Sequence, residues 1–251
     1  MNESLILGRR ALRETLRTPD SLVPTLLIPL FFLVVNVGQA ARIFPSSSTE
    51  FLNGQGYAAF QVPVSLLLAA SFGSAALYMV EEIEGGYFDK LRATPISRSA
   101  IVLGRLIAEF VKMIVLSAVM TFIALLFGVR IESGVLGFVV LILMTALWAV
   151  VYSGFMQLIA LKTRSAAATQ AGGLVFFPLL FLTPNFVPRD LLTRPMEIAA
   201  TYNPVTYVME GMRSLILDGF DWGALIAAFA VIGGALAIML FLSIRLINSY
   251  D

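Results

Sequence analysis

Charged residues divide the chain into long apolar stretches separated by short polar segments. A helix of about twenty apolar residues, rising 1.5 Å per residue, crosses a hydrocarbon core of roughly 30 Å. Six stretches are apolar enough to be predicted as membrane spans: Leu22–Ala41, Ala58–Val80, Met113–Phe127, Val135–Leu161, Ala166–Leu182 and Gly223–Ile244. The pattern therefore predicts an all-α polytopic membrane protein, with one transmembrane domain over residues 1–251 and six transmembrane helices.

The third stretch is preceded by charges at helical spacing. Glu109 and Lys112 are three residues apart and share a helix face. A functional interpretation is an intramembrane relay or binding site. The interpretation favoured by their position at the end of the span is a pair near the interface, with Lys112 reaching water.

Three segments outside the predicted spans have distinctive sequence patterns. Residues 1–21 place Leu5, Leu12 and Leu16 on one helix side and four arginines largely on the others, which is typical of an amphipathic helix on the inner membrane surface. Residues 81–105 combine three glutamates, a Gly pair and a short amphipathic turn. Residues 183–222 are too apolar and too long for a plain loop, and predict short outer helices before the last span.

For the second of these short outer helices, the sequence contains signals for both the start and the end. Asn203 is expected to be its N-cap, Pro204 to occupy its first turn, and Gly219 to lie beyond its end. Glu210 and Arg213 are three apart on this helix, where they can pair.

The basic residues fix an orientation through the positive-inside rule. With the N-terminus in the cytoplasm, the inner segments carry eleven basic residues: Arg9, Arg10, Arg13, Arg17, Lys90, Arg92, Arg98, Arg105, Lys162, Arg164 and Arg245. The outer segments carry five: Arg42, Arg130, Arg189, Arg194 and Arg213. Both termini are therefore predicted to be cytoplasmic, in agreement with an even number of spans.

Composition narrows the function. Hydrophobic residues make up 59% of the chain and charged residues 13%, with a mean hydropathy of +0.89, which excludes an ordinary soluble domain. The net charge of +1 provides no basic field for nucleic acid. With no Cys and no His, thiol and imidazole catalysis and the common metal sites are excluded, so no cofactor is expected in this chain. No phosphate-binding Gly-x-x-x-x-Gly-Lys-Ser/Thr loop is present, so transport would need a partner as its source of energy.

Two motifs give the chain a family resemblance. The segment from Glu82 to Arg98 matches the pattern Glu-x-Glu-x-Gly-x-x-x-x-Leu-x-x-Thr-Pro-Val/Ile-Ser, and the segment from Asn203 to Arg213 matches Asn-Pro-hydrophobic-Thr-Tyr-x-x-Glu-x-hydrophobic-Arg. With the predicted spans in the right order, the whole chain resembles the permease subunits of ATP-binding-cassette (ABC) type-2 exporters, including bacterial daunorubicin-type drug-resistance permeases.

The resemblance implies an assembly of two permeases, either two copies or a copy and a paralogue, with two cytoplasmic ABC ATPase subunits that bind ATP and Mg²⁺. It implies a multi-pass protein of the bacterial or archaeal cytoplasmic (inner) membrane. The segment after the second span would be a coupling helix seated in the ATPase, with Phe88 and Leu91 as apolar anchors. The residues expected to couple are Glu82, Glu84, Gly85, Phe88, Asp89, Lys90, Leu91, Arg92 and Pro95, and those expected at an outer gate are Asn203, Pro204, Tyr207, Glu210 and Arg213.

The expected substrate is hydrophobic or amphipathic, such as a drug, lipid or natural product, because the spans carry aromatics and weak polar groups without a central charge. Candidate residues on its path are Asn36, Gln39, Phe72, Gln157 and Gln170. Alternatives are a glycan or glycan-lipid exporter of the same superfamily, an ATP-independent channel or carrier and, as the weakest, an intramembrane enzyme, for which the spans hold no paired carboxylates or nucleophile with a base.

Overall fold

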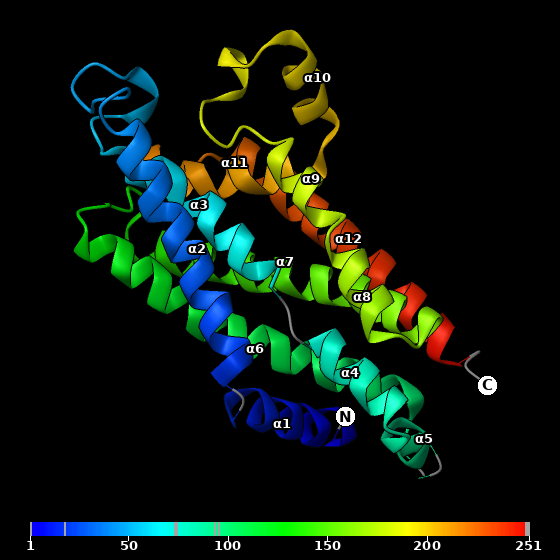
Figure 1. Ribbon diagram of the computed structural model, residues 1–251. Helices are drawn as coiled ribbons and strands as arrows, with labels where there is room; N and C mark the ends of the chain where they lie inside the picture. The colour runs from blue at the N-terminus through cyan, green and yellow to red at the C-terminus, as the bar shows by residue number, and fades with distance from the viewer. Residues whose placement is uncertain (1, 18, 73–74, 93, 95, 249–251) are drawn as a thin grey trace.

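The computed structural model describes residues 2–17, 19–72, 75–92, 94 and 96–248, and all regular structure in these ranges is helical (Figure 1). Four of the helices are long and apolar enough to cross a membrane: α2 (Pro19–Ala40), α6 (Arg98–Leu126), α7 (Gly134–Thr163) and α12 (Trp222–Asn248). The prediction of an all-α polytopic membrane protein is confirmed.

The second and fifth expected spans are not continuous helices. The second is divided into α3 (Tyr57–Ala70) and α4 (Ala75–Glu84), and the fifth into α8 (Ala166–Gly173) and α9 (Phe176–Phe181). The break before α9 has a cause in the sequence: Pro178 has no N–H for the carbonyl four residues earlier, at Leu174, where the helix is interrupted. Apolarity alone predicted the stretch but did not show its break.

The third span is longer than predicted, and its charges are enclosed. Helix α6 begins at Arg98 rather than near Met113. Lys112 Nζ lies 2.6 Å from Glu109 Oε1, and the two side chains are 2% and 3% exposed. The interpretation that Lys112 reaches water at the interface is therefore wrong, because neighbouring helices cover both charges and their pairing keeps them in the interior.

The remaining elements lie at the two ends of the bundle (Figure 1). Helices α1 (Asn2–Arg17) and α5 (Tyr87–Arg92) lie at one end, where α1 runs transverse to α2. Towards the other end lie η1 (Glu50–Leu52), η2 (Arg189–Leu191), α10 (Arg194–Tyr202) and α11 (Pro204–Leu217). Short helices before the last span are present, as predicted, and their position on the outer side stays a prediction.

Helix α1 packs against the first part of α6 through two glycines. A Cβ on Gly104 would lie 2.7 Å from the Cβ of Leu7 and 3.1 Å from the backbone nitrogen of Gly8, so the two backbones approach closely. The packed side of α1 differs from the predicted apolar side, because Leu5 is 55% exposed and Gly8 and Thr15 are buried. The side chain of Leu16 lies outside the described residues.

Two apolar clusters hold the bundle together. The larger joins α2, α3, α6, α7, α11 and α12. The smaller surrounds α5 and is formed by Met79, Phe88, Leu91, Ile101, Val102, Leu106, Leu161 and Ile247. The short helix α5 is thus packed into the body of the protein, next to the end of α12.

Candidate functional site

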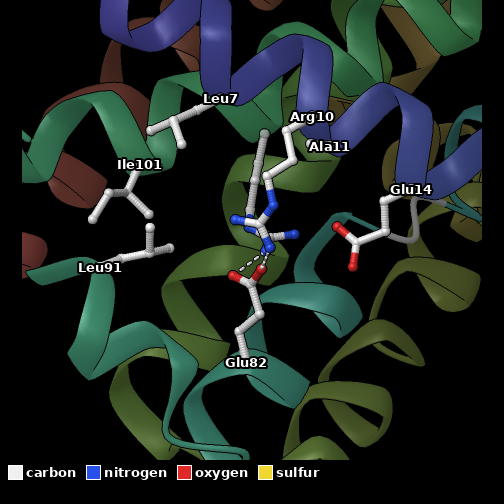
Figure 2. A pocket seen from close by; sticks show the side chains of 8 residues that line it. Leu7, Arg10, Ala11, Glu14, Glu82, Leu91 and Ile101 are labelled. Carbon is white, nitrogen blue, oxygen red and sulfur yellow. Dashed lines mark hydrogen bonds and ion pairs between the residues drawn. The ribbon is translucent and has the colours of Figure 1, made fainter.

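Glu82, the first glutamate of the first motif, is the centre of an ion cluster that joins three helices. Its Oε1 lies 2.8 Å from Nη2 of Arg10 on α1, and its Oε2 is paired with Arg105 on α6 (Figure 2). The side chains of Glu82 and Arg105 are 9% and 7% exposed, whereas that of Arg10 is 41% exposed. A buried carboxylate between two arginines holds α1, α4 and α6 in one arrangement.

Further contacts connect the same three helices to their neighbours. The guanidinium of Arg10 lies 4.5 Å from the ring centroid of Tyr87, the first residue of α5. Glu3 Oε2 accepts hydrogen bonds of 3.0 Å from the backbone N–H and the hydroxyl of Ser97, the N-cap of α6, and these bonds hold the pKa of Glu3 below its usual value. Glu84 accepts a 2.9 Å bond from the N–H of Ala166 in the first turn of α8.

The expected coupling residues do not all face outward. Phe88 is 0% and Leu91 8% exposed, so both anchor α5 to the protein itself and are not presented to a partner, contrary to the prediction. On the exposed side of the turn lie Tyr87, which is 40% exposed, and Lys90.

The rest of this segment is a tight turn. Gly85 is exposed, and Gly86 has a φ of +69°, which glycine adopts without strain. The backbones of Asp89 and Arg92 belong to α5, but their side chains lie outside the described residues, as does Pro95 altogether.

At the other end, Asn203 and Pro204 begin α11 as the sequence predicted. The Asn203 side chain accepts a 3.0 Å bond from the N–H of Val205, and its amide donates to the carbonyl of Leu179 on α9. Gly219 follows the helix with a φ of +94°. Tyr207 donates from its hydroxyl to the carbonyl of Thr201, at 2.8 Å, on the neighbouring α10.

Glu210 and Arg213 do not form an ion pair with each other, because each contacts a different partner. Arg189 forms two bonds with Glu210, of 3.1 Å from Nε and 2.6 Å from Nη2, and its guanidinium lies 5.1 Å from the Tyr207 ring centroid. Arg213 lies 3.6 Å from the ring centroid of Phe60 on α3 and donates to the carbonyl of Pro184. The suggested pairing within α11 is therefore wrong, because a bidentate partner from η2 occupies Glu210.

These side chains border an outer cavity of about 350 Å³ between α3, η2 and α11. Its lining includes Phe60, Arg189, Glu210, Arg213 and Asp218. Burial lowers the pKa of Arg213 to about 10, so the guanidinium stays charged at neutral pH, and burial raises the pKa of Asp218. The ion pair between Arg189 and Glu210 therefore forms part of the wall of this cavity.

A third group of polar residues joins α2, α3 and the segment after α9. Asn36 donates to Oε1 of Gln61 at 3.3 Å, and the Gln61 amide donates to the Tyr57 hydroxyl and to the carbonyl of Asn185. Asn36 and Asn185 line a small groove whose other walls are mostly apolar: Phe32, Val64, Ser65, Leu68, Phe177, Leu180, Phe181 and Phe186. Phe72 lies beside it, edge to face with Phe177 at 6.4 Å.

The expected path residues are thus only partly brought together. Asn36 and Phe72 belong to this groove or its border. Gln39 is exposed on α2, Gln170 is exposed on α8, and Gln157 is buried in α7 with its amide 3.5 Å from the Ser153 hydroxyl.

Sequence reasoning missed the partners of the motif residues. Arg10, Arg105 and Arg189 were used to orient the chain and not recognised as parts of a site. Arg105 carried a usable signal, because a charge one helical turn before Glu109 must be paired if the helix is buried. The link between Arg10 and Glu82, 72 residues apart, has no local signal.

We expect Glu82→Gln to destabilise the protein by about 3–5 kcal/mol, because it removes the buried carboxylate that pairs with Arg10 and with the buried Arg105. The neighbouring Glu81→Gln is the matched control, because Glu81 is exposed. Thermal unfolding of the purified chain in detergent measures both. Equal transition temperatures for the two variants would contradict the structural importance of the cluster.

Comparison with known proteins agrees with this architecture. The family model of the ABC-2 type transporter matches residues 2–217. The chain is 24% identical over 238 residues to the daunorubicin resistance ABC transporter permease protein DrrB1 of Streptomyces coeruleorubidus, covering 94% of this chain and 83% of that protein. It is 22% identical over 222 residues to the probable doxorubicin resistance ABC transporter permease protein DrrC of Mycobacterium tuberculosis, covering 86% and 78%.

A third relative is the putative transport permease ycf38 of Cyanophora paradoxa, 28% identical over 226 residues and covering 86% of this chain and 74% of that protein. The match of the family model over most of the chain, together with these relatives and the membrane-spanning helices, decides the family. The chain belongs to the ABC-2 type transporter family, as a membrane permease subunit.

Proposed function

We propose that this permease exports a hydrophobic or amphipathic molecule, such as a drug, lipid or natural product, using ATP hydrolysed by separate cytoplasmic subunits. The working unit is two permeases, identical or paralogous, with two ATPase subunits that hold ATP and Mg²⁺. The observation that carries the mechanism is the cluster at Glu82, which fastens the segment next to α5 to helices α1 and α6.

The proposed orientation combines the position of the two chain ends at one end of the bundle with the positive-inside count, which assigns that end to the cytoplasm. Ile247, near the end of α12, packs in the same cluster as Phe88 of α5, and α1 lies at this end too (Figure 1). Both chain ends on one side are what an even number of crossings requires. Six crossings result when α3 with α4, and α8 with α9, each count as one interrupted span, with α1, α5 and both termini on the cytoplasmic side of the inner membrane.

Coupling begins at α5. Tyr87 and Lys90 form the exposed surface that contacts the ATPase, while Phe88 and Leu91 fix the helix in the permease. A push on α5 reaches α4 through the Gly85–Gly86 turn and α6 through Glu82 and Arg105, because a packed, ion-paired unit moves as a body. ATP-driven closure of the two ATPase subunits would then rock the spans between inward-open and outward-open states.

The outer cavity is the exit in this scheme. Arg189 from η2 clamps Glu210 on α11, and Asn203 ties the start of α11 to α9. Breaking the Arg189–Glu210 pair would remove an ion pair that holds η2 on α11. We therefore assign the gate to this pair, with Arg213 held on Phe60 as the fixed side.

We assign part of the substrate path to the groove between α2, α3 and α9, which has a volume of about 20 Å³ in this structure and must widen to admit a substrate. Its walls are four phenylalanines and aliphatic side chains with two amides, Asn36 and Asn185. Such a lining suits an apolar body with one or two polar groups, and it favours an amphipathic molecule over a glycan, whose many hydroxyls would need many partners.

Proximity to the ATPase tests the coupling surface. The chain has no cysteine, so Lys90→Cys supplies a single cross-linking site on α5. We expect this variant to cross-link to the co-purified ATPase subunit. The control Arg194→Cys, at an exposed position at the start of α10 at the other end of the bundle (Figure 1), should cross-link far less. Recovery of no ATPase, with transport in liposomes without ATP, would contradict the export mechanism and favour a channel or carrier.

Labelling tests the outer gate. Ser214 lines the outer cavity and is 4% exposed, so Ser214→Cys should react slowly with a membrane-impermeant maleimide. Adding Arg189→Gln should raise the rate by about fivefold, as expected for losing a partly buried pair worth about 1 kcal/mol. Arg194→Gln, which breaks the exposed pair with Glu197, is the control. Equal rates in both backgrounds would remove the gate assignment.

A further inference from the structure

Helix α1 has two faces of different chemistry. The packed face carries Leu7, Gly8 and Ala11 and meets α6, α4 and the Glu82 cluster (Figure 2). The outward face carries Arg9, Arg13 and Arg17, which are exposed and four residues apart, so they form one stripe along the helix.

The acidic residues of α1 do not neutralise this stripe. Glu3 is bonded to Ser97, and Glu14 borders the pocket next to Glu82 and Arg105. Among the described residues, no carboxylate forms an ion pair with Arg9, Arg13 or Arg17. The stripe is therefore a local excess of three positive charges on an open surface.

Apolar side chains accompany the arginines. Leu5 and Ile6 are 55% and 67% exposed at the start of the same helix. Exposed leucine and isoleucine beside a row of arginines are typical of a helix whose surroundings are partly apolar and partly anionic, as at a bilayer surface. A face turned only to water would not favour these two residues.

The chain connection places α1 close to the end of a membrane span. Helix α1 ends at Arg17 and α2 begins at Pro19, and the apolar span of α2 starts at Leu22. The α2 span is mostly unburied in the protein, with Leu27 63% and Phe31 64% exposed, as expected for a helix in the apolar interior of the bilayer. A helix joined to that span within a few residues must lie at the headgroup level of the bilayer.

We propose that the outward face of α1 binds anionic phospholipid headgroups through Arg9, Arg13 and Arg17, with Leu5 and Ile6 inserted beside them. Bound lipid holds α1 at the surface, so the Arg10–Glu82 contact gives α4 a support fixed to the membrane. The proposal rests on the bilayer position proposed for α1, but it is independent of ATP-driven transport.

A lipid-selective quenching experiment tests the proposal on the full chain. Leu5→Cys, labelled with a nitrobenzoxadiazole fluorophore, is reconstituted in phosphatidylcholine bilayers containing either spin-labelled phosphatidylglycerol or the same fraction of spin-labelled phosphatidylcholine. No ATPase and no substrate are needed. We expect quenching by the anionic lipid to exceed quenching by the zwitterionic one, and the excess to fall at high salt.

The arginines are tested against a matched loss of charge. In Arg9→Gln/Arg13→Gln the selectivity for phosphatidylglycerol should fall by about 25-fold, since each arginine near a charged surface contributes roughly fivefold. In the control Arg42→Gln/Arg130→Gln, which removes two exposed arginines outside α1, it should not change.

Each other outcome overturns the proposal. Equal quenching by the two lipids would show that the face does not select anionic headgroups. Absence of quenching by either would show that the face is not at the bilayer. Loss of quenching only when the ATPase subunit is added would identify the face as a protein interface instead.

Discussion

Burial of the Glu82 carboxylate is the constraint on which the end of this permease that carries α1 and α5 depends. A carboxylate that is 9% exposed needs charged partners, and the chain supplies one from α1 and one from α6. Because these partners lie on separate helices, the pairing is also a mechanical connection. It joins the helix before α5 to the helix after it, and both to the N-terminal helix.

The same physical rule explains the other end of the bundle. Polar groups inside a membrane domain must find partners within the protein, and here several of those partners lie on other helices. Gln61 connects Asn36, Tyr57 and the carbonyl of Asn185, and Asn203 connects α11 to α9. These bonds connect α3 and α9, each one part of an interrupted span, to neighbouring segments of the protein.

Much of the fold could be predicted from the sequence, because apolar length predicts a span and because Asn203, Pro204 and Gly219 are local signals for the ends of α11. What could not be predicted depended on contacts distant in sequence. The break before α9 could be predicted only by giving Pro178 more weight than the apolar run around it. The burial of Phe88 depends on its packing in one cluster with Ile247 of α12, far away in the sequence. The environment of the charged residues could not be predicted either, because it also depends on contacts distant in sequence. Lys112 was assigned to the interface because its cover, like the Arg10 partner of Glu82, comes from other helices.

The central claim is that α5, α1 and the start of α6 move as one body when the ATPase acts. Distances between spin labels on Arg9→Cys and Lys90→Cys, measured by double electron–electron resonance in the ATPase complex with labelled chain diluted into unlabelled chain, test it directly. The account predicts the same narrow distribution with and without ATP, while the distance from residue 90 to a label at Ile198→Cys on α10 changes. A 9–90 distance that shifts on ATP binding would contradict it.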